Sequence, residues 1–174
     1  MISALLMLMS TPLNEMKSSM EPVSMDQGIS MFSKLCFEKF PDSKAVLDAI
    51  GDPALGLTKL PKTPSEAMQP GDSWSSSTAR VTYVDADWLP SDFGSPQCSA
   101  TVLLSGKPSH SSIAKAMTTK LALPTVKFGK DGARAQTKWD KAGLALATWR
   151  IFLTTEQTPS GIQMRVINTN MRGK

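Results

Sequence analysis

The sequence is poor in the residues on which most metal and catalytic sites depend. It contains one histidine, His110, and two cysteines, Cys36 and Cys98, among 174 residues. His110 by itself cannot form a zinc site, because zinc takes several nitrogen, sulfur or oxygen ligands. The spacings CxxC, HExxH and GxSxG and a glycine-rich phosphate loop are also missing from the sequence. We therefore predict no metal, no cofactor and no catalytic residue, and enzymatic activity is not the favoured interpretation.

Long apolar runs are missing too. None reaches the roughly 18 residues of a membrane-spanning helix, so we predict no transmembrane segment. The apolar stretch from Ile2 to Met9 has the length of a short signal-peptide core, but no basic residues precede it and no small-residue cleavage site follows. Two interpretations stay open: an exported protein whose leader begins at a misplaced start, or a cytoplasmic protein with a short amphipathic N-terminus. We favour export, and thus a periplasmic or secreted protein.

The length and composition are those of a globular protein. A chain of 174 residues with 41% apolar and 20% charged residues suits one folded domain with a useful core. Residues 1–24 are expected to be a short apolar leader and a flexible lead-in. Residues 25–174 are expected to form a single domain.

Charge is distributed unevenly along the chain. Residues 1–106 hold seven basic and twelve acidic residues, whereas residues 107–174 hold twelve basic and three acidic ones. The two halves can simply neutralise each other across one domain, or the basic half can bind an anionic partner. Lys127, Lys130, Arg134 and Lys138 are the candidate binding residues of this half. No aromatic stacking residues accompany them, so nucleic acid is an unlikely partner.

Periodicity predicts an α+β fold. Ser24 and Gln27 have capping-box spacing before a helix that ends at Pro41, and Asp42 can cap a second helix that stops at Gly51. Residues 51–76 read as a long surface connection. Alternating strands follow around 79–84 and 98–104, then a helix capped by Ser109, a short strand within 125–143, and a hairpin flanking residues 155–160. The order helix-helix-strand-strand-helix-strand-strand predicts an antiparallel sheet of about 4–5 strands with helices on one face.

Few side chains suggest chemistry. A catalytic His110 acting with a distant Ser or Asp, as in a small hydrolase, competes with a solvated histidine at the start of a helix. Asp85, Asp87 and Asp92 do not match a calcium loop and are better explained as a solvated acidic hairpin end. Trp74 and Trp88 flank the first strand, where they either line a binding groove or close the edge of the core.

Cys36 and Cys98 lie in apolar segments, one on an expected helix and one on an expected strand. A disulfide between them would close a loop of about 60 residues and stabilise the fold by about 4 kcal/mol. Two reduced, buried thiols are the alternative if the protein is cytoplasmic.

The F-x-x-x-C spacing of Phe32 and Cys36, followed by a cysteine-bearing strand at Cys98–Ala100 and a C-terminal hairpin, resembles a group of small exported bacterial proteins of uncharacterised activity. The resemblance implies export and a disulfide, but no activity. We therefore expect a non-catalytic binding or structural domain of the bacterial cell envelope. Its partner would be a protein or an anionic ligand, held by the loops or by the basic half.

Overall fold

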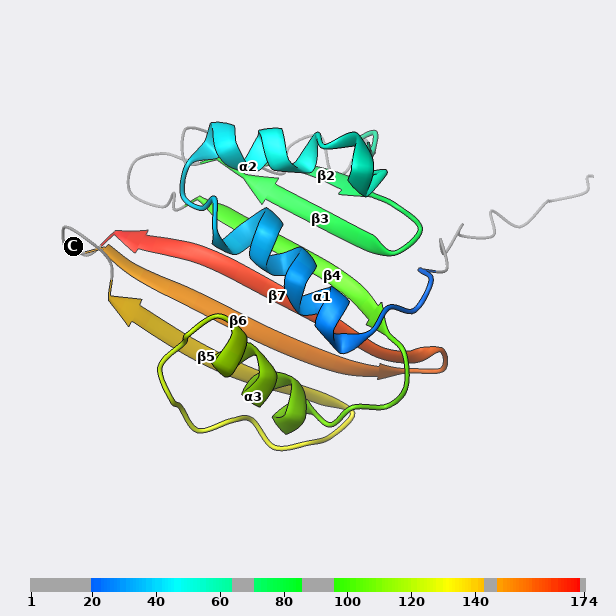
Figure 1. Ribbon diagram of the computed structural model, residues 1–174, viewed down its shortest axis with the longest axis vertical. Coiled ribbons are helices and arrows are strands. Elements are labelled where there is room, and N and C mark those ends of the chain that lie inside the picture. The colour runs from blue at the N-terminus through cyan, green and yellow to red at the C-terminus, as the bar shows by residue number, and fades with distance from the viewer. Residues whose placement is uncertain (1–19, 64–70, 86–95, 143–146, 173–174) are drawn as a thin grey trace, which may run out of the picture.

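The computed structural model describes residues 20–63, 71–85, 96–142 and 147–172. Seven strands form one open antiparallel sheet in the order β1-β2-β3-β4-β7-β6-β5 (Figure 1). The strands are β1 (Thr58–Lys59), β2 (Asp72–Ser75), β3 (Ala79–Val84), β4 (Gln97–Leu104), β5 (Arg134–Ala142), β6 (Ala147–Thr158) and β7 (Gly161–Arg172). Because β7 lies between β4 and β6, the C-terminal hairpin of β6 and β7 joins strands β1 to β4 to the edge strand β5.

The helices lie together on one face of the sheet (Figure 1). They are α1 (Met25–Phe32), which continues into the π-helical turn η1 (Ser33–Phe37), α2 (Ser43–Ile50), the short 3₁₀ turn η2 (Pro53–Leu55) and α3 (His110–Lys120). The predicted α+β class, with helices covering one face of an antiparallel sheet, is confirmed.

The first helix begins where its capping box predicts. The Ser24 hydroxyl accepts a hydrogen bond from the backbone N–H of Gln27, and the Gln27 side chain accepts one from the N–H of Ser24. Gly28 then faces the sheet: a Cβ there would lie 3.0 to 3.3 Å from the side chains of Met164, Val102 and Leu104. The absence of a side chain at Gly28 therefore lets α1 approach β4 and β7 closely.

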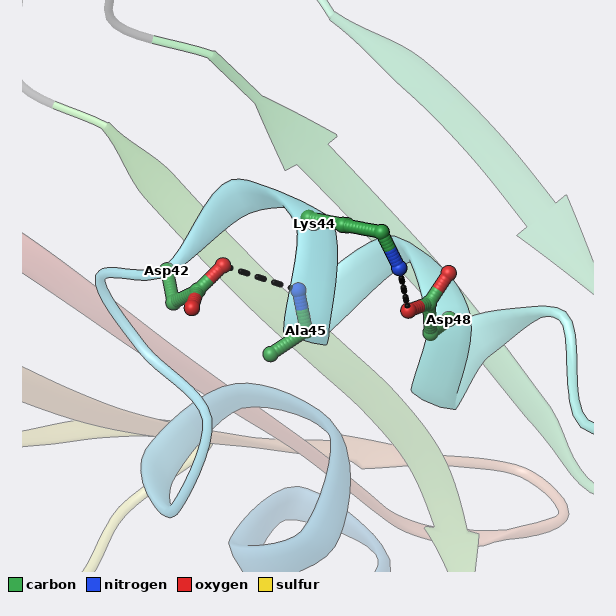
Figure 2. Close-up of polar contacts among 4 residues, drawn as sticks. All are labelled: Asp42, Lys44, Ala45 and Asp48. Atoms are coloured by element: carbon green, nitrogen blue, oxygen red, sulfur yellow. Dashed lines mark hydrogen bonds and ion pairs between the residues drawn. The ribbon is translucent and has the colours of Figure 1, made fainter.

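The second helix also follows its sequence signals. The Asp42 carboxylate accepts a hydrogen bond from the N–H of Ala45 at 3.0 Å, and Lys44 pairs with Asp48 one turn along (Figure 2). Gly51 is the C-cap. Val46 and Ile50 are fully buried against the sheet, as their spacing predicts.

The predicted number of about 4–5 strands is too low. The two missed strands, β1 and β2, lie within residues 51–76, which the sequence suggests to be a loop. The sequence does not predict these two strands because β1 has only two residues and β2 is the polar sequence Asp-Ser-Trp-Ser, which is half-buried at every position. Neither strand shows the alternation of apolar and polar residues on which sequence-based assignment depends.

The C-terminal hairpin is confirmed, with longer strands than expected. β6 and β7 each have 12 residues, and Thr158 pairs with Gly161, so only Pro159 and Ser160 form the turn. The strand expected within residues 125–143 runs over nine residues as β5 and forms one edge of the sheet.

The predicted disulfide between Cys36 and Cys98 is present. Both cysteines are fully buried, and the bond connects η1 to β4 across the interface between the helices and the sheet. Beside it, the Asn168 side chain donates a hydrogen bond to the backbone carbonyl of Cys36 at 2.8 Å. Covalent and polar links thus fasten the first helical segment to two neighbouring central strands.

The opposite face of the sheet, called the open face below, has no helix packed on it among the residues that the structure describes. Side chains alternate between the two faces along a strand. Since Cys98, Val166 and Trp139 point toward the helices, the residues next to them point away. The open face consists of side chains from β3, β4, β7, β6 and β5: Arg80, Thr82, Val84, Gln97, Ser99, Thr101, Leu103, Gln163, Arg165, Ile167, Thr169, Arg150, Phe152, Thr154, Glu156, Arg134, Gln136, Lys138 and Asp140.

Candidate functional site

His110 is not the solvated residue that one sequence interpretation proposed. It is the first residue of α3 and only 4% exposed. Its Nδ1 lies 2.8 Å from the hydroxyl of Thr155, and its Nε2 lies 2.8 Å from the hydroxyl of Thr137. Burial lowers the pKa of His110 below 6.5, and the nearby Asp131 opposes this only in part. The ring is therefore neutral at neutral pH and connects α3 to β5 and β6.

The hydrogen-bond network favours one tautomer of His110. The Thr137 hydroxyl accepts a hydrogen bond from the backbone N–H of Gly129 at 2.9 Å, and Thr137 is only 2% exposed. Donation of its own proton to Nε2 of His110 satisfies this buried hydroxyl. Nδ1 then carries the ring proton and donates to Thr155. In this arrangement the ring accepts a hydrogen bond from Thr137 alone, and because Thr137 is only 2% exposed, the hydroxyl that His110 could activate is not accessible to a substrate.

A hollow of about 300 Å³ lies beside His110, at the end of the sheet near the β6–β7 turn. Lys107, Ser109, Asp131, Thr155 and Glu156 are among the residues that line it. The Ser109 hydroxyl caps α3 by accepting from the N–H of Ser112, as predicted, and Asp131 accepts from the N–H of Ser111. Both side chains thus serve the N-terminus of α3, and no Ser or Asp among the described residues hydrogen-bonds the His110 ring.

The structure places the predicted basic residues in two different elements. Lys127 and Lys130 are exposed in the segment between α3 and β5. Arg134 and Lys138 lie on β5 and point to the open face, whereas Lys141 points to the helical face, where its ammonium lies 5.5 Å from the ring of Phe37. The alternation of side chains along β5 therefore divides this basic stretch between two sides of the sheet.

The predicted aromatic pair is only half described. Trp74 lies on β2, points to the helical side and is half-buried, and it lines a second hollow together with Leu47 and Asp85. Trp88 lies outside the described residues, as do Asp87 and Asp92 of the acidic trio. Asp85 is half-buried and accepts a hydrogen bond from the hydroxyl of Ser43 at 3.2 Å.

The open face brings together arginines that the sequence analysis did not connect. Arg80 on β3 and Arg165 on β7 both pair with Thr101 on β4, one from each side, so they belong to the same row across the sheet. Neighbouring strands lie about 4.8 Å apart, which places the backbones of the two arginines about 10 Å apart. Both side chains are exposed, and no acidic residue among those described pairs with either of them.

The acidic residues of the open face lie toward its β5 edge. Asp140 accepts a hydrogen bond from Arg150 at 2.6 Å and pairs with Lys138 at 3.2 Å. The hydrogen bond from Arg150, followed by the contact with Lys138, lowers the pKa of the Asp140 carboxyl. With Glu156, the open face carries two acidic against five basic side chains in the part of the chain that the structure describes.

Apolar side chains lie at the middle of this basic face. Ile167 on β7 pairs with Phe152 on β6, and both are half-buried without a covering element among the described residues. The signal that could have identified this surface is the outward half of the strand alternation, where arginine, threonine and single apolar residues recur. Only the strand order, however, places β3 and β6 on the two sides of β4 and β7.

No helix in the described ranges is long and apolar enough to cross a membrane. Comparison with protein-family models, with curated proteins and with solved structures finds no match for the chain. Its function must therefore be argued from the geometry of these surfaces.

Proposed function

We propose that this protein is a non-catalytic binding domain of the bacterial cell envelope that contacts an anionic partner through the open face of its sheet. One observation carries the proposal: Arg80 and Arg165 lie on the same cross-strand row of an uncovered face without acidic partners among the described residues. Arginine guanidinium groups hydrogen-bond carboxylates, sulfates and phosphates through a planar fork of N–H donors.

The surroundings of the two arginines support recognition of an extended, polar partner. Thr82, Thr101 and Thr154 supply hydroxyls next to them, and all three are half-buried in the sheet surface. Strands hold such groups at fixed spacing, so little conformational entropy is lost when a partner binds. Among the described residues of the open face Phe152 is the one aromatic side chain, so they provide no ladder of rings for stacking bases, which keeps nucleic acid the less favoured partner.

The location outside the cytoplasm is part of the same proposal. Cys36 and Cys98 form a buried disulfide, and structural disulfides persist mainly in oxidising compartments. Intact mass spectrometry of the protein from its native host, with and without reductant, tests this. A gain of two hydrogens on reduction and a shortened N-terminus are expected; reduced cysteines in freshly isolated protein would contradict the proposed location.

Retention on immobilised heparin tests the binding face. The salt concentration at elution should fall in a double variant, Arg80→Gln with Arg165→Gln, with affinity at fixed salt about threefold to tenfold lower. Lys34→Gln with Lys115→Gln is the matched control, because it removes the same charge from exposed residues on the helical side. Equal elution of the two double variants, or retention that does not depend on salt, would contradict the proposal.

The hydrolase alternative is less well supported by the geometry. Both ring nitrogens of His110 are engaged by threonine hydroxyls, and Thr137, the one that donates to the ring in the favoured tautomer, is buried and so cannot reach a substrate. A structural role of His110 explains its burial, its two bonds and its neutral state together.

A further inference from the structure

A second hollow, of about 200 Å³, lies on the helical side of the sheet, away from the open face. It is lined by Leu47 from α2, by Lys62, Asp72 and Trp74 from the β1–β2 region, and by Tyr83 and Asp85 from and just after β3. Residues from three separate parts of the chain thus form one concave surface. The proposal below concerns this hollow and does not depend on the function of the open face.

One wall of the hollow is apolar and incompletely buried. Leu47 is 41% exposed and is the single large apolar residue with this exposure among the described part of the chain. Trp74 opposite β3 is half-buried, although its neighbours Val81 and Tyr83 are buried. An exposed leucine and a partly exposed indole that line the same hollow provide contact area for the alkyl part of a small ligand.

The carboxylates of the hollow differ in their partners. Asp72 is paired with Lys59 at 2.7 Å and with Lys62 at 3.8 Å. Asp85 has no basic partner among the described residues and accepts one hydrogen bond, from Ser43, whose hydroxyl in turn accepts from Tyr83 at 2.7 Å. The other carboxylate oxygen of the half-buried Asp85 has no hydrogen-bond donor among the described residues, and a charge in such a position favours a cationic partner.

A lysine of the protein already lies against the indole of Trp74, although Lys59 is not itself one of the residues that line the hollow. The ammonium of Lys59 lies 5.8 Å from the centre of the Trp74 ring while it pairs with Asp72. Ammonium groups are attracted to the face of an indole, and the attraction increases when water is partly excluded. Lys59 is 58% exposed, so it is held weakly enough to move aside.

From the apolar wall, from Asp85 without a basic partner among the described residues, and from the lysine beside Trp74, we propose that this hollow binds an alkylammonium group, with the alkyl chain against Leu47 and Trp74 and the ammonium near Asp85. The ligand class is a small organic amine. Lys59 competes with the ligand for the indole. Removing Lys59 should therefore strengthen binding, whereas removing the charge of Asp85 should weaken it.

Nuclear magnetic resonance titration with butylammonium chloride tests the proposal, with the indole N–H of Trp74 as the reporter and 1-butanol as the uncharged probe. The Trp74 signal is identified from the spectrum of Trp74→Phe. We expect a saturable shift with butylammonium and at least about threefold weaker binding of butanol. Asp85→Asn should weaken butylammonium binding about threefold to fivefold, and Lys59→Met should strengthen it about twofold to threefold.

Asp48→Asn is the matched control, because Asp48 lies on α2 and pairs with Lys44 (Figure 2) but is not one of the residues that line the hollow. It should leave the affinity unchanged, as should Arg80→Gln with Arg165→Gln, which separates this proposal from the one for the open face. No saturable shift, equal binding of the two probes, unchanged affinity in Asp85→Asn, or weaker binding in Lys59→Met would each overturn the proposal. Damage to the fold cannot explain a gain of affinity in Lys59→Met.

Discussion

At the scale of single residues, the sole histidine of the chain shows how little a residue type says without its surroundings. His110 follows a serine and precedes two more, which suggests either a catalytic group or a solvated helix start. In the structure its ring hydrogen-bonds Thr137 and Thr155 rather than any of these serines. Its partners come from β5 and β6, so no local pattern around position 110 could have identified them.

The first prediction concerns the two hydrogen bonds of His110. Replacement by alanine leaves two buried threonine hydroxyls without their partner, so His110→Ala should lower the free energy of unfolding by about 2–3 kcal/mol. Urea denaturation measures the change. Thr119→Ala serves as the control, because Thr119 is exposed on the same helix and its side chain bonds to the carbonyl of Lys115. An equal loss of stability in both variants would contradict a stabilising role of the two hydrogen bonds of His110.

The second prediction follows from the pKa of His110. Burial lowers it below 6.5, so below pH 6.5 the unfolded chain binds a proton more readily than the folded one. The neutral ring therefore makes its full contribution to the free energy of unfolding above pH 6.5, and this contribution is lost as the pH falls. The free energy of unfolding, followed from about pH 7.5 to 5.5, should therefore decline more steeply in the native protein than in His110→Gln. If the free energy of unfolding changed with pH equally in both proteins, the lowered pKa of His110 in the folded state would be contradicted.

At the scale of helices and strands, sequence signals located most elements that have a regular period and a defined cap. The capping box of Ser24, the caps Asp42 and Ser109, and the C-terminal hairpin are all found in the structure. Pro41 follows the first helical segment, as expected. The short, polar strands β1 and β2 were missed, because their pairing with β3, rather than their own composition, makes them strands.

The third prediction tests the cap of α2. Asp42→Ala removes the acceptor of the Ala45 N–H and should lower the free energy of unfolding by about 1 kcal/mol. Asp48→Ala on the same helix removes the surface pair with Lys44, which raises the pKa of that lysine but contributes little to stability (Figure 2). Thermal unfolding of the two variants should therefore show a clear decrease of Tm only for Asp42→Ala. The reverse order would contradict the capping role.

At the scale of the whole molecule, the disulfide and the sheet order decide which distant segments meet. Cys36 and Cys98 are separated by 62 positions, and their bond fastens the first helical layer to the centre of the sheet. Both cysteines are fully buried, so the disulfide is also part of the hydrophobic core between the helices and the sheet. The sheet order also leaves one face without helices in the described part of the chain, which provides the surface for the proposed function.

The fourth prediction concerns the disulfide. Removing both cysteines, as in Cys36→Ala with Cys98→Ala, should lower the free energy of unfolding by about 4 kcal/mol, because the unfolded chain loses the constraint of a long loop. Chemical denaturation with and without reductant measures this. The reductant should destabilise the native protein and leave the double variant unchanged; insensitivity of the native protein to complete reduction would contradict the prediction.

The candidate surfaces were only partly accessible from the sequence. Charge counting indicated Arg134 and Lys138, and both lie on the open face, but it also grouped them with Lys127 and Lys130, which lie in the preceding segment. Trp74, which the sequence suggested as a groove residue or as a residue closing the edge of the core, lines a hollow in the structure. The sequence did not connect it with Leu47 and Asp85, because α2 and the end of β3 meet β2 only after the chain has folded.

The sequence by itself determined the helices with caps, the long alternating strands and the fold class, since these depend on periodic burial and on hydrogen bonds between near neighbours. Tertiary structure alone decided that His110 is buried between two threonines, that Arg80 and Arg165 share a row, and that Asp85 lies in a hollow with Trp74. These outcomes depend on strand order and register, which place residues side by side irrespective of their separation along the chain.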